Sequence, residues 1–255
     1  MKILAIVNQK GGVGKTTTAS NLGAALGILG KTVLVIDVDP QGNCSDTLGI
    51  NSKMQENHLG TIIGLPKIKQ EDVASCIQKT EFEGLFVLPS HVTLSDQADL
   101  LNVKVGHDLK LKKIVSEVKD LFDYIILDSP PNLGILFKNV LAASTDVIIP
   151  VVPDYFSISG LVDLLDTIEE IRDTYSPELK IMGVILTKYE ARYNITKEIA
   201  YNLEKYLPGK MFETKIRNNN QVMYAQNNMM PVVCYNAKCN ASIDYLKLAK
   251  EVSKQ

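Results

Sequence analysis

Two lysines and a glycine-rich turn near the N-terminus are residue types that together bind phosphate. The run K-G-G-V-G-K-T-T covers residues 10–17 and follows the apolar stretch of residues 3–7. A glycine-rich turn between a strand and a helix points backbone N–H groups and a helix N-terminus at one place, which makes a cradle for phosphate. The sequence therefore predicts a nucleotide site, with the Lys15 ammonium at the β- and γ-phosphates and the Thr16 hydroxyl on Mg²⁺. We expect the cradle to consist of Gly11, Gly12, Val13, Gly14, Lys15, Thr16 and Thr17.

The turn departs from the usual phosphate-loop pattern at its first position. The pattern G-x-x-x-x-G-K-[ST] requires glycine at position 9, where this chain has Gln9, and a second lysine, Lys10, stands at the mouth of the loop. A glycine-rich turn alone is also compatible with a plain tight turn. The order of strand, loop, Gly-Lys-Thr and helix favours nucleotide binding.

Three aspartates follow two further apolar stretches. Residues 32–36 lead into Asp37 and Asp39, and residues 124–127 lead into Asp128. Ligands of open α/β sheets bind at the carboxyl ends of the strands, and Mg²⁺ prefers oxygen ligands. Each aspartate taken singly could instead cap the next helix. Because all three come beside a Gly-Lys-Thr loop, we expect Asp37 and Asp128 to hold Mg²⁺, directly or through water, and Asp39 to orient the water that attacks the γ-phosphate.

Apolar runs and amphipathic segments alternate along the chain. This alternation predicts an α/β fold, a mostly parallel twisted sheet with helices on both faces, and the 255 residues are expected to form a single domain, 1–255. Residues 51–70 carry the least pattern, and we expect them to leave the body as a mobile excursion. Further strands are expected at residues 84–88, 147–152, 181–186 and 211–216, and helices at 15–29, 109–119, 133–143, 158–174, 195–207 and 242–252.

Composition and charge restrict the class of protein. No apolar run approaches the ~18 residues of a membrane span, and the four cysteines form no C-x-x-C pair, as expected for a cytoplasmic protein with free thiols. The charge is uneven: residues 1–178 hold 15 Lys and Arg against 23 Asp and Glu, whereas residues 179–255 hold 12 against 6. A basic C-terminal third can attract DNA phosphates, although a solvated lysine-rich surface would give the same count.

The motifs together resemble one known group of proteins. K-G-G-V-G-K-T-T, D-V-D-P-Q-G-N and Y-I-I-L-D-S-P-P-N-L-G are similar to segments of the deviant-Walker ATPases of the ParA/Soj/MinD group, and D-P-Q-G-N followed by Leu48-Gly49 points to the ParA/Soj branch. The resemblance covers nearly the whole chain. It implies a P-loop NTPase-like fold, ATP and Mg²⁺ as cofactors, and hydrolysis of ATP to ADP and phosphate. It also implies that Lys10 acts in catalysis by crossing to the phosphates of a partner subunit in an ATP-sandwich homodimer.

The resemblance implies further contacts near the C-terminus, with departures. Arg192 lies in a segment similar to the one that carries a DNA-facing arginine, while Asn220 stands where relatives often have a second one. Arg217 and Asn218 match the segment that passes near the adenine, although the family's proline is replaced by Ile216. Charge for DNA could also come from Lys188, Lys197, Lys205, Lys210, Lys215 and Lys247.

The sequence features bear on three different functions. The resemblance favours a partition ATPase that binds nonspecific double-stranded DNA, associates with the nucleoid and is stimulated by a ParB-like partner protein. The sequence does not distinguish a chromosome, a plasmid or a protein cluster as the cargo. A MinD-like membrane switch would need a membrane-binding last helix, and we expect that helix to pack on the body instead. A metal-cluster ATPase of the nitrogenase-iron-protein kind is excluded, because residues 77–233 contain no cysteine.

Overall fold

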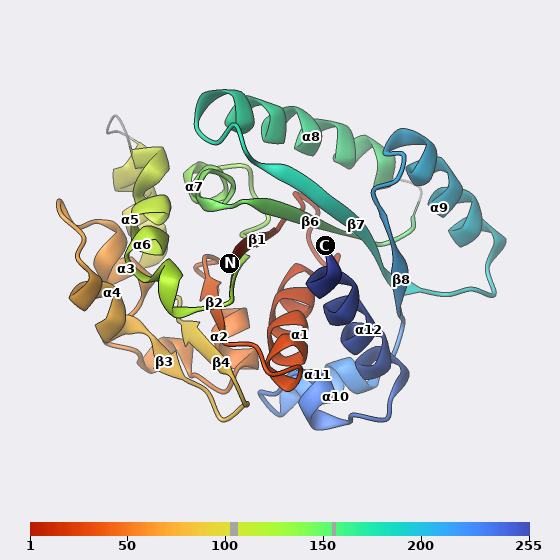
Figure 1. Ribbon diagram of the computed structural model, residues 1–255, viewed down its shortest axis with the longest axis horizontal. Coiled ribbons are helices and arrows are strands. Elements are labelled where there is room, and N and C mark those ends of the chain that lie inside the picture. Colours follow the sequence, from red (N-terminus) through yellow and green to blue (C-terminus); the bar gives the residue numbers. More distant parts are fainter. Residues whose placement is uncertain (103–106, 155–156) are drawn as a thin grey trace.

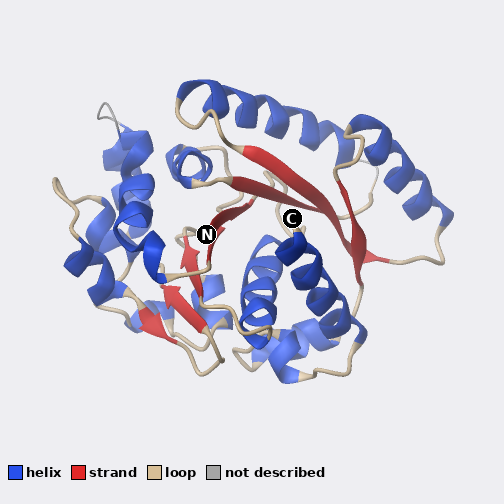
Figure 2. Cartoon of the chain, in the orientation of Figure 1, coloured by secondary structure: helices blue, strands red, loops and turns tan. Residues whose placement is uncertain are grey.

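The computed structural model describes residues 1–102, 107–154 and 157–255, and its described strands form one eight-stranded sheet. The order is β3-β4-β2-β5-β1-β6-β7-β8. All neighbouring pairs are parallel except β3 with β4. Figures 1 and 2 show the twisted sheet with helices on both faces, so the predicted fold class is confirmed. The strands are β1 (Lys2–Ile6), β2 (Val33–Asp37), β3 (Gln78–Lys79), β4 (Leu85–Leu88), β5 (Tyr124–Asp128), β6 (Asp146–Val151), β7 (Lys180–Tyr189) and β8 (Met211–Arg217).

The helices connect the parallel strands and pack on the two faces of the sheet. The longest ones, α1, α8, α9 and α12, coincide with helices predicted from the sequence, while α2 to α5, α10 and α11 were not predicted. The helices are α1 (Lys15–Ile28), α2 (Asn43–Thr47), α3 (Leu59–Ile63), α4 (Gln70–Cys76), α5 (Leu94–Asn102), α6 (Lys110–Val118), α7 (Ile135–Ala143), α8 (Ser157–Thr174), α9 (Asn194–Tyr206), α10 (Gln221–Asn227), α11 (Val232–Tyr235) and α12 (Asn240–Lys254).

The central strand β1 divides the hydrophobic core into two layers. Successive side chains of a strand point to opposite faces, and β1 is apolar at nearly every position because helices cover both faces. Ile3 and Ala5 join the layer under α3 to α9, and Leu4 and Ile6 join the layer under α1, α11 and α12. The helices thus hold β1, and the loop that follows it, from both sides.

The segment 51–70 is part of the body, so the expectation of a mobile excursion is wrong. Leu59, Ile62 and Ile63 of α3 are at most 4% exposed and belong to the core. Their i, i+3, i+4 spacing is helical. The helix is too short to stand out as a periodic pattern in the sequence. Gly60 lies inside it and Gly64 follows it directly, which weakens the helical signal further.

The last helix packs on the body, as predicted. Tyr245, Leu248, Ala249 and Val252 of α12 are at most 1% exposed and share a core layer with α1. Ile243, on the same helix, is 37% exposed. Of the helices in the described ranges, none combines the length and the apolar character that crossing a membrane requires.

Candidate nucleotide-binding site

The phosphate loop begins where β1 ends and leads directly into α1. Gly12 and Gly14 have φ angles of 73° and 88°, a left-handed backbone that favours glycine. The Asn8 amide anchors the start of the loop: its Nδ2 donates to the Pro150 carbonyl oxygen (2.8 Å), and its Oδ1 accepts from the Lys10 backbone N–H (2.9 Å). The left-handed glycines and the start of α1 give the cradle geometry that the sequence predicted.

Gln9 occupies the position of the missing first glycine and has a structural contact of its own. Its Nε2 donates to the Gly160 carbonyl oxygen in α8 at 2.8 Å. The side chain therefore ties the loop to α8, which a glycine could not do.

Lys15 lies inside the loop as a buried cation. Lys15 is 7% exposed, and its Nζ contacts the Lys10 carbonyl oxygen at 3.3 Å. Burial lowers the pKa of Lys15, while the nearby charges of Asp128 and Asp39 oppose that shift. A buried ammonium with one long contact to a carbonyl oxygen has donor capacity left for an anionic ligand.

Two buried carboxylates face each other across neighbouring strands. Asp37 of β2 pairs in register with Asp128 of β5, and both are 0% exposed. Asp37 accepts hydrogen bonds from the Ser45 N–H (2.8 Å) and the Ser45 hydroxyl (2.7 Å), whereas neither oxygen of Asp128 has a hydrogen bond of normal geometry from any described residue. Burial raises the pKa of Asp37 to about 7, and burial, followed by the charge of Asp37, raises that of Asp128.

This pair fits a divalent cation. An unpartnered buried carboxylate is costly unless a ligand completes it, and the Thr16 hydroxyl lies close enough to oppose the rise in the Asp128 pKa. The described residues contain no cluster of three or more His, Cys, Asp or Glu side chains suited to a metal. That is compatible with Mg²⁺, which is usually bound by one or two carboxylates together with water and substrate phosphates.

Asp39 and Lys10 lie at the rim of the site. Asp39 lines the cavity, and its Oδ1 accepts from the Gln41 N–H at 3.0 Å. The Lys10 ammonium leaves its own loop and forms an ion pair with Asp154. The structure thus places one lysine inside the loop and the other outside it.

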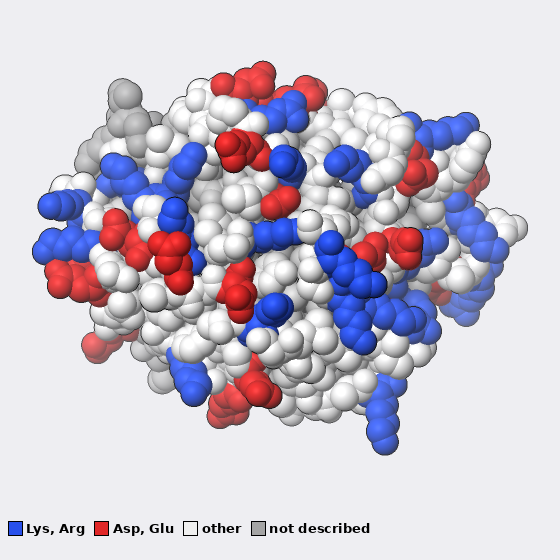
Figure 3. Space-filling model, viewed as in Figure 1, with Lys and Arg blue, Asp and Glu red and all other residues white. Residues whose placement is uncertain are grey.

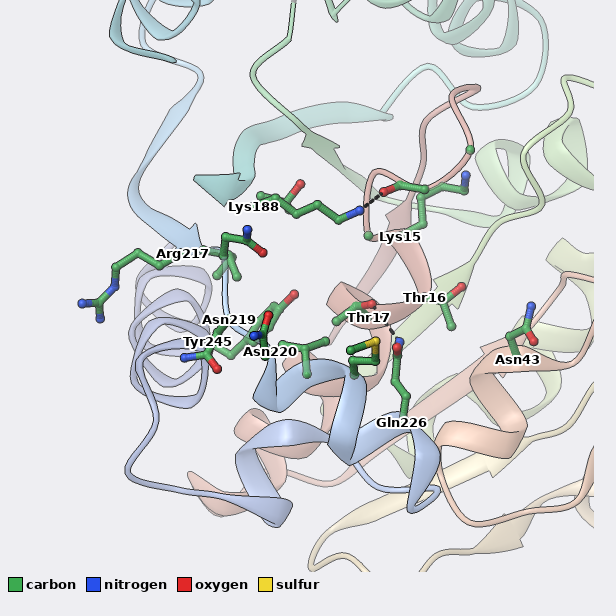
Figure 4. A pocket seen from close by; sticks show the side chains of 18 of the residues that line it. Lys15, Thr16, Thr17, Asn43, Lys188, Arg217, Asn219, Asn220, Gln226 and Tyr245 are labelled. Carbon is green, nitrogen blue, oxygen red and sulfur yellow. Dashed lines mark hydrogen bonds between the residues drawn. The ribbon is translucent and has the colours of Figure 1, made fainter. Parts of the chain in front are cut away.

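The cavity, of about 550 Å³, extends from the loop to the last residues of β7 and to the end of β8 with the residues that follow it. Thr187 donates through its hydroxyl to the Val13 carbonyl oxygen (2.7 Å), and the Lys188 ammonium donates to the Gly12 carbonyl oxygen (2.9 Å). Lys188, considered above for DNA, therefore lies at the nucleotide pocket (Figure 4). Gln226 reaches in from α10 and donates to the Thr17 hydroxyl at 3.2 Å.

Asn218 and Arg217 both line this end of the cavity but differ in direction. The Arg217 guanidinium points away from it (Figure 4) and forms two bonds to Asp244 of α12, at 2.9 and 2.7 Å. The Asn218 amide donates to Glu190 at 3.0 Å. Arg192 lies outside the cavity, with a side chain 72% exposed and a 2.8 Å ion pair to Glu190.

Several residues of the cavity were not predicted from the sequence. Lys188 had a usable signal, because it lies near the carboxyl end of the buried parallel strand β7. Asn43, Met223, Gln226 and Tyr245 also line the cavity. They come from the start of α2 and from α10 and α12, and nothing in the local sequence indicates that these helices meet.

Comparisons with known proteins agree with the geometry. The AAA domain family matches residues 1–181. The chain is 39% identical over 252 residues to the sporulation initiation inhibitor protein Soj of Bacillus subtilis, covering 99% of this chain and 98% of that protein. It is 37% identical to the chromosome partitioning protein ParA of Caulobacter vibrioides, covering 99% and 94%.

Solved structures share the fold and include nucleotide complexes. Cobyrinic acid a,c-diamide synthase of Mycobacterium smegmatis with bound ADP and magnesium is 27% identical, with a TM-score of 0.84 over 98% of this chain and 93% of that one. The cell division ATPase MinD of Pyrococcus furiosus is 25% identical, with a TM-score of 0.80 over 99% and 98%. The chain is therefore an ATPase that uses Mg²⁺ and belongs to the ParA/Soj family.

Proposed function

We propose that this ATPase is a DNA-partitioning switch. It dimerises around ATP, binds nonspecific double-stranded DNA as a dimer, and hydrolyses ATP slowly until a partner protein stimulates it. Its relatives are named for chromosome partitioning. On this proposal the protein is found in the cytoplasm, associated with the nucleoid.

The observation that carries the proposal is the separation of the two lysines. Lys15 already supplies the cation inside the loop, and Lys10 lies outside it beside Asp154. A lysine that does not serve its own loop is available to the phosphates of a second subunit, in the manner of an arginine finger supplied in trans. A monomer then lacks one catalytic cation, which accounts for slow turnover before dimerisation.

The remaining roles follow from the charges around the loop. Thr16, Asp37 and Asp128 would hold Mg²⁺, the aspartates directly or through water, and the ion would offset the charge that develops in phosphoryl transfer. Asp39, at the rim, would orient the attacking water. Backbone N–H groups of the loop would hold the β-phosphate, with Thr17 near the α-phosphate.

DNA binding is proposed for the surface around Arg192. Lys and Arg side chains gather over α9, β8 and the C-terminal end of α12 (Figure 3). This surface belongs to the basic third of the chain. Phosphate contacts from such a surface give an affinity that is independent of sequence and falls with salt. A dimer would present this basic surface twice.

The proposal is tested by measuring binding to two unrelated duplexes, with ATP and with ADP. Asp39→Ala serves to trap the ATP dimer, which gel filtration with light scattering should detect. We expect this trapped dimer to bind both duplexes about equally. Arg192→Ala should lower both affinities and should reduce the log–log salt slope by about one for each DNA phosphate that is no longer neutralised.

The matched control is Arg172→Ala, since Arg172 on α8 also pairs with a glutamate, Glu169, but lies outside the basic third. It should leave DNA binding unchanged. Failure of the trapped dimer to bind DNA at low salt, together with ATP-dependent binding to anionic liposomes, would replace this proposal with the membrane switch.

A further inference from the structure

One carboxylate lies between the nucleotide cavity and the surface proposed for DNA. Glu190 follows β7, and its two oxygens have different partners. Oε1 accepts from the Asn218 amide at 3.0 Å, and Oε2 accepts from Arg192 Nε at 3.0 Å. The hydrogen bond from Asn218, and then those from Arg192, lower the pKa of Glu190, so the group is ionised at neutral pH.

An ionised carboxylate fixes which way the Asn218 amide faces. A carboxylate only accepts hydrogen bonds, so the NH₂ group of Asn218 must point toward Glu190 and Oδ1 must point away from it. The backbone is held too, because Asn218 N–H donates to the Tyr189 carbonyl oxygen at 3.2 Å. Among the described residues, Asn218 Oδ1 has no hydrogen-bond partner, and Asn218 lines the cavity.

The direction of this amide matters for the base of the nucleotide. The other end of the same cavity is the phosphate loop, and Lys188 connects the two ends through its bond to Gly12. An amide oxygen accepts from the 6-amino group of adenine, and the second N–H of the same amide can donate to N7. Guanine has a carbonyl oxygen at position 6, so the same amide would set two acceptors against each other.

We propose that Glu190 is a positioning residue that makes the site select adenine over guanine nucleotides through Asn218 and couples this base contact to Arg192. Without the negative charge, the amide of Asn218 can turn and offer its NH₂ group to guanine. The coupling half of this inference rests on the proposed DNA binding: a DNA phosphate that draws Arg192 away leaves Glu190 with Asn218 alone, so the two ligands influence each other reciprocally.

The first experiment measures the ratio of GTP to ATP dissociation constants by competition against a fluorescent nucleotide. Glu190→Gln keeps the shape and removes the charge. We expect it to reduce the preference for ATP by about tenfold, within the range that one bidentate amide–base contact supplies. The matched control is Glu198→Gln, which removes one exposed acid from α9 and should leave the ratio unchanged.

A double-mutant cycle separates positioning from a general structural effect. In an Asn218→Ala background, Glu190→Gln should change the ratio no further, because there is no amide left to orient. Thermal unfolding shows whether each variant is folded. A folded Glu190→Gln protein that keeps the wild-type ratio would overturn base selection, and so would a wild-type protein that binds GTP as tightly as ATP.

The coupling is measured as the change in ATP affinity when a saturating duplex is added. We expect a change of about fivefold in the wild type and in Glu198→Gln, at the low end of typical couplings, and none in Glu190→Gln or Arg192→Ala. Equal changes in the wild type and Glu190→Gln would overturn the coupling. A wild-type protein that binds no DNA in either nucleotide state would overturn the proposed function and the coupling together, while base selection is decided by the nucleotide ratios alone.

Discussion

The two ends of the nucleotide cavity are built in opposite ways. At the phosphate end, Lys15, Asp37 and Asp128 are at most 7% exposed, and within the described residues neither oxygen of Asp128 has a hydrogen bond of normal geometry. At the base end, the polar side chains are more exposed and already bonded: Arg217 to Asp244 and Asn218 to Glu190. The phosphate end is therefore incomplete without a ligand, whereas the base end is held by the protein itself.

This difference follows from where each end lies in the fold. The phosphate end lies where β1, β2 and β5 end side by side in the middle of the sheet, where helices exclude water and unpaired charge is costly. The base end lies at the carboxyl ends of β7 and β8, on the edge side of the sheet. Ligand binding should thus change the energy of the first end strongly and that of the second weakly.

The largest expected effect is at the phosphate end. Lys15→Ala should lower ATP affinity by about a hundredfold or more, because truncating one partner of a buried charge contact costs ~2–5 kcal/mol. Calorimetry with Mg²⁺ and ATP measures it. Lys10→Ala is the comparison and should keep the affinity of the monomer, since its ammonium lies outside the loop beside Asp154. Equal losses in both variants would contradict the separation of the two lysines.

The second prediction concerns pH in the absence of ligand. The pKa of Asp37 is raised to about 7 and that of Asp128 is raised too. A carboxyl with a raised folded-state pKa binds more protons folded than unfolded, so its contribution to stability is complete below the unfolded pKa, ~4, and is lost as pH rises to the folded value. In a chelator we expect the free energy of unfolding to be about 2 kcal/mol or more lower at pH 7.5 than at pH 5.

Denaturant titrations at several pH values measure this slope. Asp128→Asn should flatten it, and Mg²⁺ with ATP should remove it. His58, whose pKa burial lowers, acts in the opposite direction. The decisive quantity is therefore the difference between the wild type and Asp128→Asn. Identical slopes in these two proteins would show that Asp128 carries no such energy.

The third prediction tests whether the base end is held by the protein itself. Arg217→Ala should lower the free energy of unfolding by about 2 kcal/mol, because it removes charge-assisted bonds from a buried acceptor; the Asp244 side chain is 5% exposed. Arg172→Ala, which breaks an exposed 3.4 Å pair with Glu169, should cost under ~0.5 kcal/mol. Urea unfolding of both variants gives the comparison, and equal costs would remove the structural role of Arg217.

The same contrast explains what could be predicted from the sequence. The phosphate end depends on strands and on α1, whose continuous apolar runs and Gly-Lys-Thr signal are local, so the sheet, the loop and the aspartates at the strand ends were all anticipated. The base end depends on α10 and α12 returning to α1, which brings Gln226 to Thr17. The partners of Arg217 and Arg192 likewise follow from tertiary packing, and α3 is too short to show its periodicity.

The smallest expected effect concerns Lys188, where the base end stores strain in its backbone. Lys188 has a φ angle of 48°, a left-handed conformation that a side chain disfavours, while its ammonium bonds to Gly12 at 2.9 Å. Lys188→Ala loses the bond and keeps the strain, whereas Lys188→Gly loses both. We therefore expect the glycine variant to be more stable than the alanine variant by about 1 kcal/mol, the usual scale for alanine at a positive φ. Thermal unfolding without nucleotide measures this difference. If alanine proves equal to or more stable than glycine, then the end of β7 relaxes freely, and its left-handed turn is imposed by the bond between Lys188 and the phosphate loop.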